Sequence, residues 1–232
     1  MFFPFFFDWT IIILIPAILL AGYAQIKVKS TFNKYAKVSA DSGLTGAQVA
    51  KKLLDEAGIY DVSIELTQGS LSDHYDPKKK VLRLSPEVYQ RASLAALGVA
   101  AHETGHAIQH NVGYFPLELR SSFVPVASIG SSLAFPLLII GVLLSSPSLA
   151  YIGIYAFSAA VLFQIITLPV EFNASNRAVA ILEGGGYVSR QEVSGARKVL
   201  NAAALTYLAA ALMAVLNLVR MLAIVGFFGG DD

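Results

Sequence analysis

Two histidines four positions apart, with a glutamate directly after the first, stand out in this sequence: His102, Glu103 and His106. On an α-helix, side chains at i and i+4 share a face, so both imidazoles can reach one ion. Zinc accepts imidazole nitrogen at about 2.0–2.1 Å. The glutamate is adjacent to that face and can take a proton from an attacking water. We therefore interpret His102 and His106 as zinc ligands and Glu103 as a catalytic general base.

Chance is a weak explanation of this spacing. If four His and eight Glu were ordered at random among 232 residues, one such pattern would arise with a probability of roughly 2 in 1,000. A histidine-bearing helix without a metal is the alternative. It would bury two rings and a carboxylate among Ala100, Ala101, Ala107 and Ile108 without partners, which costs free energy.

A catalytic zinc site needs a third protein ligand and one open position. The stretch from Ser121 to Val170 contains no Asp, Glu, Lys or Arg, and these fifty residues fit two membrane spans of roughly 20 residues each. A helical hairpin returns to the membrane face that it left, and Glu171 is the first charged residue on that return. We predict Glu171 as the third ligand; Glu183, Glu118 and Asp73 remain alternatives.

Other polar side chains could support this site. Ser175 lies one turn after Glu171 and could hydrogen-bond a ligand. Arg177 could stabilise an oxyanion or bind a peptide carboxylate, or it could be a cytoplasmic flanking charge. His74, in a turn-rich segment, is expected to be a loop residue that could reach over the cleft. His110 extends the motif face by another turn, and we expect it behind the ligands or at the surface.

The composition indicates an integral membrane protein. Hydrophobic residues make up 55% of the chain and charged residues 14%, against about 25% charge in soluble domains. The first apolar stretch precedes the first basic residue, Lys27, so we interpret it as a retained anchor and not as a cleaved signal peptide. We expect four spans, at about 9–28, 122–144, 149–170 and 201–225.

Basic residues near the span ends set the orientation. They follow the first span, precede the second and lie between the third and fourth, which predicts that these segments are cytoplasmic and both termini outside. The inverted orientation remains the alternative. The residues that carry this prediction are Lys27, Lys29, Lys34, Lys37, Arg120, Arg177, Arg190, Arg197 and Lys198.

The predicted fold class is a mainly α integral membrane protein, with about four transmembrane helices and a small cytoplasmic α+β region holding a short hairpin or sheet. The expected divisions are an anchor at 1–28, a cytoplasmic region with the motif helix at 29–120 and a transmembrane hairpin at 121–170. A cytoplasmic segment with the third ligand follows at 171–200, then a C-terminal transmembrane helix and short tail at 201–232.

Local patterns predict the elements of the cytoplasmic region. An amphipathic helix covers 44–58 with Thr45 as its cap, and alternating residues predict strands at 62–66 and 81–84, joined by turns. Ser85 caps a helix that begins at Pro86. The motif helix follows at about 93–110. We expect an edge strand from 71–84 to bind an extended peptide.

The rest of the composition mainly excludes certain kinds of site and partner. The absence of cysteine excludes disulfides, zinc fingers and thiol catalysis, so a tight metal site must use His, Asp or Glu. A net charge of +1, without a basic run interleaved with aromatics, argues against a nucleic-acid partner. The oligomeric state has no signature in the sequence.

Five segments together carry a resemblance to the YugP-like family of bacterial membrane zinc metallopeptidases, over almost the full chain. The resemblance implies zinc as cofactor, a peptide or protein substrate near the bilayer, and a multi-pass protein of the bacterial inner membrane. The segments are Ser72–Pro77, Leu82–Ser85, Ala101–Gln109, Leu168–Ser175 and Val199–Tyr207.

A more distant similarity is to HtpX-type and CAAX-prenyl-type membrane proteases. Those proteins share the histidine-glutamate helix and a later glutamate ligand, usually with an aspartate four residues after that ligand to orient a histidine. This chain has Ser175 at that position. The similarity therefore implies the same ligand set with an uncharged group behind one imidazole.

These features predict a membrane-bound zinc metalloendopeptidase that hydrolyses peptide bonds with a zinc-activated water and Glu103 as base, at the cytoplasmic membrane face. A site-2-type intramembrane protease fits poorly, because only nine uncharged residues precede His102 and no Asp follows within the spans. A transporter would need ionisable residues in mid-span. A non-proteolytic scaffold or metal-binding adaptor with a degenerate site remains the alternative.

Overall fold

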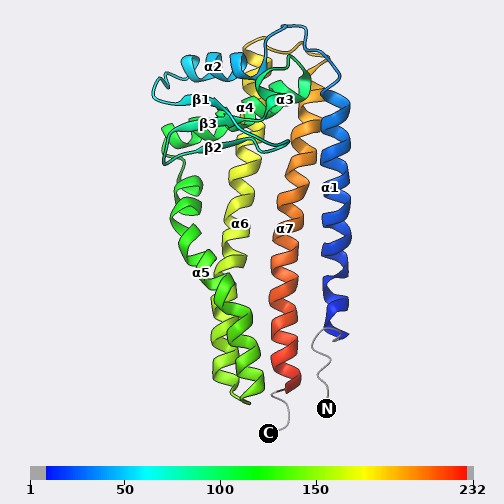
Figure 1. Cartoon of the computed structure of the whole chain (residues 1–232), viewed down its shortest axis with the longest axis vertical. Coiled ribbons are helices and arrows are strands. Elements are labelled where there is room, and N and C mark those ends of the chain that lie inside the picture. The colour runs from blue at the N-terminus through cyan, green and yellow to red at the C-terminus, as the bar shows by residue number, and fades with distance from the viewer. Residues whose placement is uncertain (1–8, 229–232) are drawn as a thin grey trace. The chain divides into compact units, whose positions relative to one another are not determined.

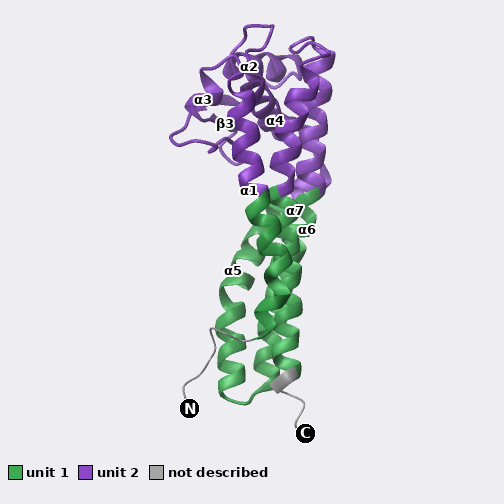
Figure 2. Ribbon diagram, turned by 90° about the vertical axis from the view of Figure 1, so that its right-hand side faces the viewer, with its two compact units in different colours: residues 1–23, 119–168, 206–232 green, residues 24–118, 169–205 purple. Residues whose placement is uncertain are grey.

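The computed structural model describes residues 9–228, so residues 1–8 of the predicted anchor and 229–232 of the predicted tail lie outside the described residues. The chain forms two compact units (Figure 2). We call residues 1–23, 119–168 and 206–232 the membrane unit, and residues 24–118 and 169–205 the site unit. Helices α1, α5, α6 and α7 contribute residues to both.

Within residues 9–228, four helices are long and apolar enough to cross a membrane, which confirms the predicted mainly α membrane protein. A 3₁₀ turn (η1, Trp9–Leu14) leads into α1 (Ile15–Tyr35), and the others are α5 (Phe115–Leu143), α6 (Pro147–Gly184) and α7 (Val193–Phe228) (Figure 1). The helices extend beyond the predicted spans, because helix formation continues into the polar flanks. The uncharged stretch breaks where predicted: Ser145 has a φ of 49°, and a proline begins α6.

Small residues bring α5 and α6 close together within the membrane unit. A Cβ added at Gly153 would lie 2.7 Å from the carbonyl oxygen of Ala134 and 3.0 Å from the backbone nitrogen of Leu138. Glycine at such a crossing lets two backbones approach, which is how membrane helices associate without a hydrophobic driving force. Phe157, Ala214 and Met221 belong to the buried apolar cluster around this contact.

The site unit carries a small sheet beside short helices (Figure 1). Helix α2 (Gly46–Glu56) begins with a capping box between Thr45 and Gln48, as expected of the Thr45 cap. Strands β1 (Ser63–Leu66), β2 (His74–Asp76) and β3 (Val81–Leu84) have the order β1-β3-β2, with β1 parallel and β2 antiparallel to β3.

One local prediction in this region is wrong, and the predicted Ser85 cap is confirmed in position but not in its side-chain hydrogen bond. His74 is not a loop residue, because His74–Asp76 pair with β3 and the turn is confined to Pro77–Lys80, where Lys80 has a φ of 52°. Ser85 has the backbone geometry of a cap, but its hydroxyl donates to Asp73 at 3.1 Å and makes no capping hydrogen bond. The helix that follows, α3 (Pro86–Tyr89), is a single turn.

Helix α4 (Leu94–Asn111) carries the histidine motif through the middle of the site unit. Ser93 caps it by accepting from the backbone N–H of Ala96 at 3.2 Å. Nearly every position of α4 is buried, because one side packs on α6 and α7 and another on β3 and α2. Seven of its 18 residues are alanine or glycine, so its neighbours can surround it closely.

Candidate metal centre

The close approach of α4 and α6 positions the site. A Cβ added at Gly105 would lie 3.0 Å from the carbonyl oxygen of Ala174, so α4 and α6 are in backbone contact at this point. Ala174 is three residues after Glu171, so the contact turns the Glu171 carboxylate toward the histidine face of α4. This contact also explains why the motif tolerates glycine in a helix interior, where it normally costs about 1 kcal/mol.

Three donor atoms converge at this contact, and we call His102, His106 and Glu171 the donor cluster. The Oε2 atom of Glu171 lies 3.3 Å from Nε2 of His102 and 3.5 Å from Nε2 of His106. The imidazole rings are 4.8 Å apart and nearly perpendicular, at 84°. Within residues 9–228, these three side chains are the group of metal-binding type whose donor atoms gather within 4.8 Å.

The cluster fits zinc in geometry and in donor chemistry. Tetrahedral zinc with bonds of about 2.0–2.1 Å holds its ligand atoms about 3.3–3.4 Å apart, close to the observed 3.3 and 3.5 Å. All three side chains are buried, and Glu171 is only 2% exposed. A cation among these three side chains would add to the stabilisation of the buried Glu171 carboxylate, since burying a charge is costly.

The second nitrogen of each imidazole has a protein partner. Nδ1 of His106 lies 2.9 Å from Oε1 of Gln109, and Nδ1 of His102 lies 3.2 Å from Oγ of Ser175. An amide oxygen only accepts, so His106 carries its proton on Nδ1 and presents the lone pair of Nε2 to the cluster. When the Ser175 hydroxyl accepts the Nδ1 proton of His102, the lone pair of His102 Nε2 also faces the cluster.

Gln109 links α4 to α6 through a buried network that the sequence interpretation missed. Its Nε2 donates to the carbonyl oxygen of Val170 and to Oδ1 of Asn173, both at 2.9 Å, which fixes the amide so that Oε1 faces His106. Nε of Arg177 donates to the same Asn173 oxygen at 2.8 Å. The available signal was the spacing, because Gln109 is three residues after His106 and so shares its helix face.

Comparison with known proteins identifies the family of this chain. The family described as "Putative neutral zinc metallopeptidase" matches residues 10–226. The chain is also 50% identical over 222 residues to "Putative membrane protease YugP" of Bacillus subtilis (strain 168), covering 96% of this chain and 98% of that protein. The chain belongs to this zinc metallopeptidase family. No solved structure matches the chain. The family resemblance expected from the sequence is therefore confirmed, and zinc is the metal that the family implies.

Glu103, which the sequence predicts as the general base, is buried on α4 directly after His102. Asp73 lies close enough for the Glu103 charge to act on it. Burial, and secondarily that charge, raises the pKa of Asp73 above its ordinary value, although hydrogen bonds from Ser85 oppose the shift. Asp73 accepts from the Ser85 backbone N–H at 2.7 Å and its hydroxyl at 3.1 Å, and it lies outside the donor cluster. Glu118 and Glu183 lie outside it too.

The other two histidines of this chain are engaged elsewhere. His74 is exposed on β2, with Nδ1 2.9 Å from the carbonyl oxygen of Ser72 and Nε2 3.4 Å from Arg83. Nδ1 of His110 lies 2.8 Å from the hydroxyl of Tyr75. Burial raises the pKa of Tyr75 to about 12, so this hydroxyl keeps its proton at neutral pH. The structure therefore does not bring His74 or His110 into the donor cluster.

Proposed function

We propose that this chain is a membrane zinc metalloendopeptidase in which His102, His106 and Glu171 bind the metal. The observation that carries the proposal is the convergence of two Nε2 atoms and one Oε2 atom at 3.3 and 3.5 Å, on the helix that also bears Glu103. Zinc bound there would supply an acidified water and polarise the scissile carbonyl.

Glu103 acts as the general base in this proposal. Its place directly after His102 puts the carboxylate beside the donor cluster, and its burial shields it from bulk water. It takes the proton of the attacking water and then delivers it to the leaving amine, so one carboxylate serves both halves of the reaction.

The contacts behind the imidazoles keep the ligands oriented. Gln109 holds the His106 ring through Nδ1, and Ser175 contacts Nδ1 of His102. Arg177 already donates to Asn173, which supports a role in bracing the Gln109 network. The alternatives for Arg177, oxyanion stabilisation or binding of a substrate carboxylate, would use the other guanidinium nitrogens.

An extended peptide fits the sheet edge formed by β2. This strand pairs with β3 along one side only, so its other side can add a substrate strand through main-chain hydrogen bonds. Strand β2 also packs against α4, which bears the motif. The basic flanks of the spans support a site on the cytoplasmic face of a bacterial inner membrane, and hence cytoplasmic or juxtamembrane substrates.

The test compares purified full-length wild type with Glu103→Gln, measuring zinc content and cleavage of an unstructured reporter peptide. We expect both proteins to bind one zinc and only the wild type to cleave. Equal residual cleavage by both would assign the activity to a contaminant. Zinc binding without cleavage by the wild type would favour a metal-binding adaptor instead.

A further inference from the structure

A cavity of about 520 Å³ lies within the membrane unit, between α5, α6 and α7, and we call it the membrane cavity. It is separate from the donor cluster, none of whose residues line it. Eight lining residues are apolar: Val124, Ala127, Phe157, Ala160, Phe163, Ala210, Met213 and Ala214. The other four carry hydroxyl or amide groups: Ser128, Ser131, Gln164 and Asn217.

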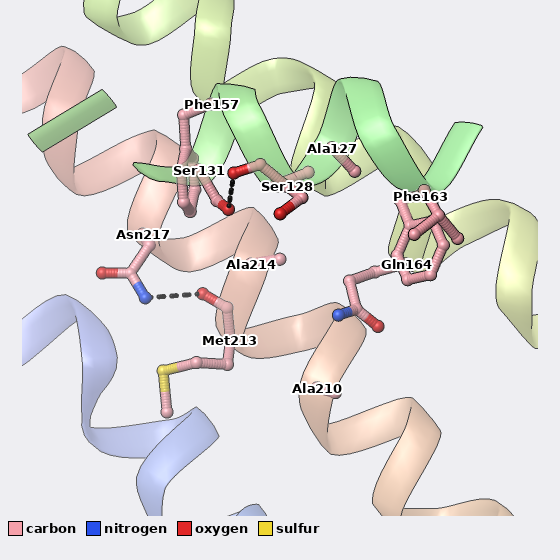
Figure 3. A pocket seen from close by; sticks show the side chains of 12 residues that line it. Ala127, Ser128, Ser131, Phe157, Phe163, Gln164, Ala210, Met213, Ala214 and Asn217 are labelled. Atoms are coloured by element: carbon pink, nitrogen blue, oxygen red, sulfur yellow. Dashed lines mark hydrogen bonds between the residues drawn. The ribbon is translucent and has the colours of Figure 1, made fainter. Parts of the chain in front are cut away.

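The four polar side chains come from three different helices (Figure 3). Ser131 donates to the carbonyl oxygen of Ser128 at 3.0 Å, and Nδ2 of Asn217 donates to that of Met213 at 3.1 Å (Figure 3). Among the described residues, the half-buried amide of Gln164 makes no hydrogen bond with another side chain or with the backbone. An amide without a partner is costly in a hydrocarbon environment. The membrane cavity therefore favours an occupant that brings its own donors and acceptors.

The apolar part of the lining suits a helix as occupant. Four alanines line the cavity: Ala127, Ala160, Ala210 and Ala214. Small residues allow close backbone approach between membrane helices, and hydroxyl and amide side chains then hydrogen-bond across the interface. Both features occur together here, on three helices.

Other occupants match this lining less well. The stretch 121–170, which supplies the α5 and α6 lining, has no charged residue, so a phosphate headgroup would find no countercharge there. Acyl chains offer no hydrogen bonds to Gln164. A second copy would present the same concave surface in a two-fold contact, and two hollows do not fill each other.

We propose that the membrane cavity binds a membrane-spanning helix of the substrate, at a stretch of that helix with small and amide or hydroxyl residues. This proposal rests on the proposed peptidase function, since it names the class of substrate that the enzyme would hold in the bilayer. Helix α6 contributes Gln164 to the membrane cavity and Glu171 to the donor cluster.

The test uses disulfide crosslinking, because the chain has no cysteine of its own. Full-length Glu103→Gln protein, which needs no turnover, carries either Ser131→Cys in the cavity or Leu133→Cys as control. Leu133 is on the same helix, is 49% exposed and does not line the cavity. The probes are two synthetic leucine-rich transmembrane peptides with one cysteine, in phosphatidylcholine vesicles. One has a central Asn-Gly-Ser segment and the other has leucine there.

We expect the polar peptide to crosslink to Ser131→Cys at least fivefold more than to Leu133→Cys, and fivefold more than the all-leucine peptide does. Adding Gln164→Leu and Asn217→Leu should remove the preference, while unchanged zinc content and elution volume would report intact folding. Equal crosslinking at both positions, no effect of the leucine substitutions, or predominant protein–protein disulfides at Ser131→Cys would overturn the proposal. The experiment measures binding to an inactive variant. Its outcome therefore tests the cavity proposal separately from the proposed peptidase activity.

Discussion

At the scale of single residues, the site depends on how each imidazole is held and not only on the ligands themselves. Gln109 is fully buried and accepts from His106 while donating to two oxygens of the α6 segment. Partners behind metal ligands typically change metal affinity 10–100-fold when they are removed. Gln109 is therefore the side chain outside the donor cluster to which zinc affinity should be most sensitive.

Replacing Gln109 separates its accepting role from its packing. In Gln109→Leu nothing accepts the His106 proton, and we expect zinc affinity to fall about 10–100-fold. Gln109→Glu keeps an acceptor beside Nδ1 of His106, so it should lose clearly less zinc affinity, although its second oxygen can no longer donate to Val170 and Asn173 and the variant should be less stable. Competition with a zinc chelator measures both, and equal affinities in the two variants would mean that Gln109 has only a packing role.

Ser175 offers a weaker version of the same support. Its hydroxyl contacts Nδ1 of His102 at 3.2 Å and carries no charge, so Ser175→Ala should lower zinc affinity about tenfold or less. Asn176→Ala is the matched control, because the neighbouring side chain is exposed. A loss in Ser175→Ala larger than that in Gln109→Leu would mean that His102, and not His106, depends more on the group behind its ring.

At the scale of elements, the contact between α4 and α6 brings Glu171 to the histidines. The sequence predicted much of this: the motif spacing identified α4, and the uncharged stretch identified a hairpin that returns at Glu171. An edge strand was expected within 71–84, but its position at His74–Asp76 (β2) was not predicted, because three residues among turn formers give no readable alternation. The Gln109 contact escaped because a polar residue at i+3 reveals a shared face but not what the neighbouring helix places opposite.

Two glycines of α4 test the importance of this contact. A Cβ at Gly105 would lie 3.0 Å from the Ala174 carbonyl oxygen, whereas at Gly98 the nearest atoms, from Ala196, are at an ordinary 3.7 Å. Gly105→Ala should therefore push α6 away and weaken zinc binding at least tenfold. Gly98→Ala should keep zinc affinity and gain up to about 1 kcal/mol of stability from helix propensity. Zinc titration and thermal unfolding read out both, and tight zinc binding by Gly105→Ala would show that the close α4–α6 contact is dispensable.

At the scale of the whole molecule, the apolar helices and the family relationship agree on a membrane protein of a zinc metallopeptidase family. Hydropathy located the four spans because a bilayer demands long apolar helices whatever their packing. The membrane cavity could not be anticipated in this way. Ser131, Gln164 and Asn217 are separated along the chain, and only helix packing shows that they line one space.

The predicted orientation can be tested with introduced cysteines. Gln90→Cys in the site unit and Ser148→Cys after the α5–α6 turn both replace exposed residues. With the site on the cytoplasmic side, an impermeant maleimide should label Ser148→Cys in intact cells and Gln90→Cys only after the membrane is opened. The reverse pattern would establish the inverted orientation.

The central claim is that a glutamate after the hairpin completes a metal site begun by two histidines, and zinc affinity of purified Glu171→Ala tests it most directly. Glu183→Ala is the control, because Glu183 is an exposed carboxylate on the same helix. We expect Glu171→Ala to lose tight zinc binding, as His102→Ala does, while Glu183→Ala binds like the wild type. Wild-type affinity in Glu171→Ala would contradict the claim.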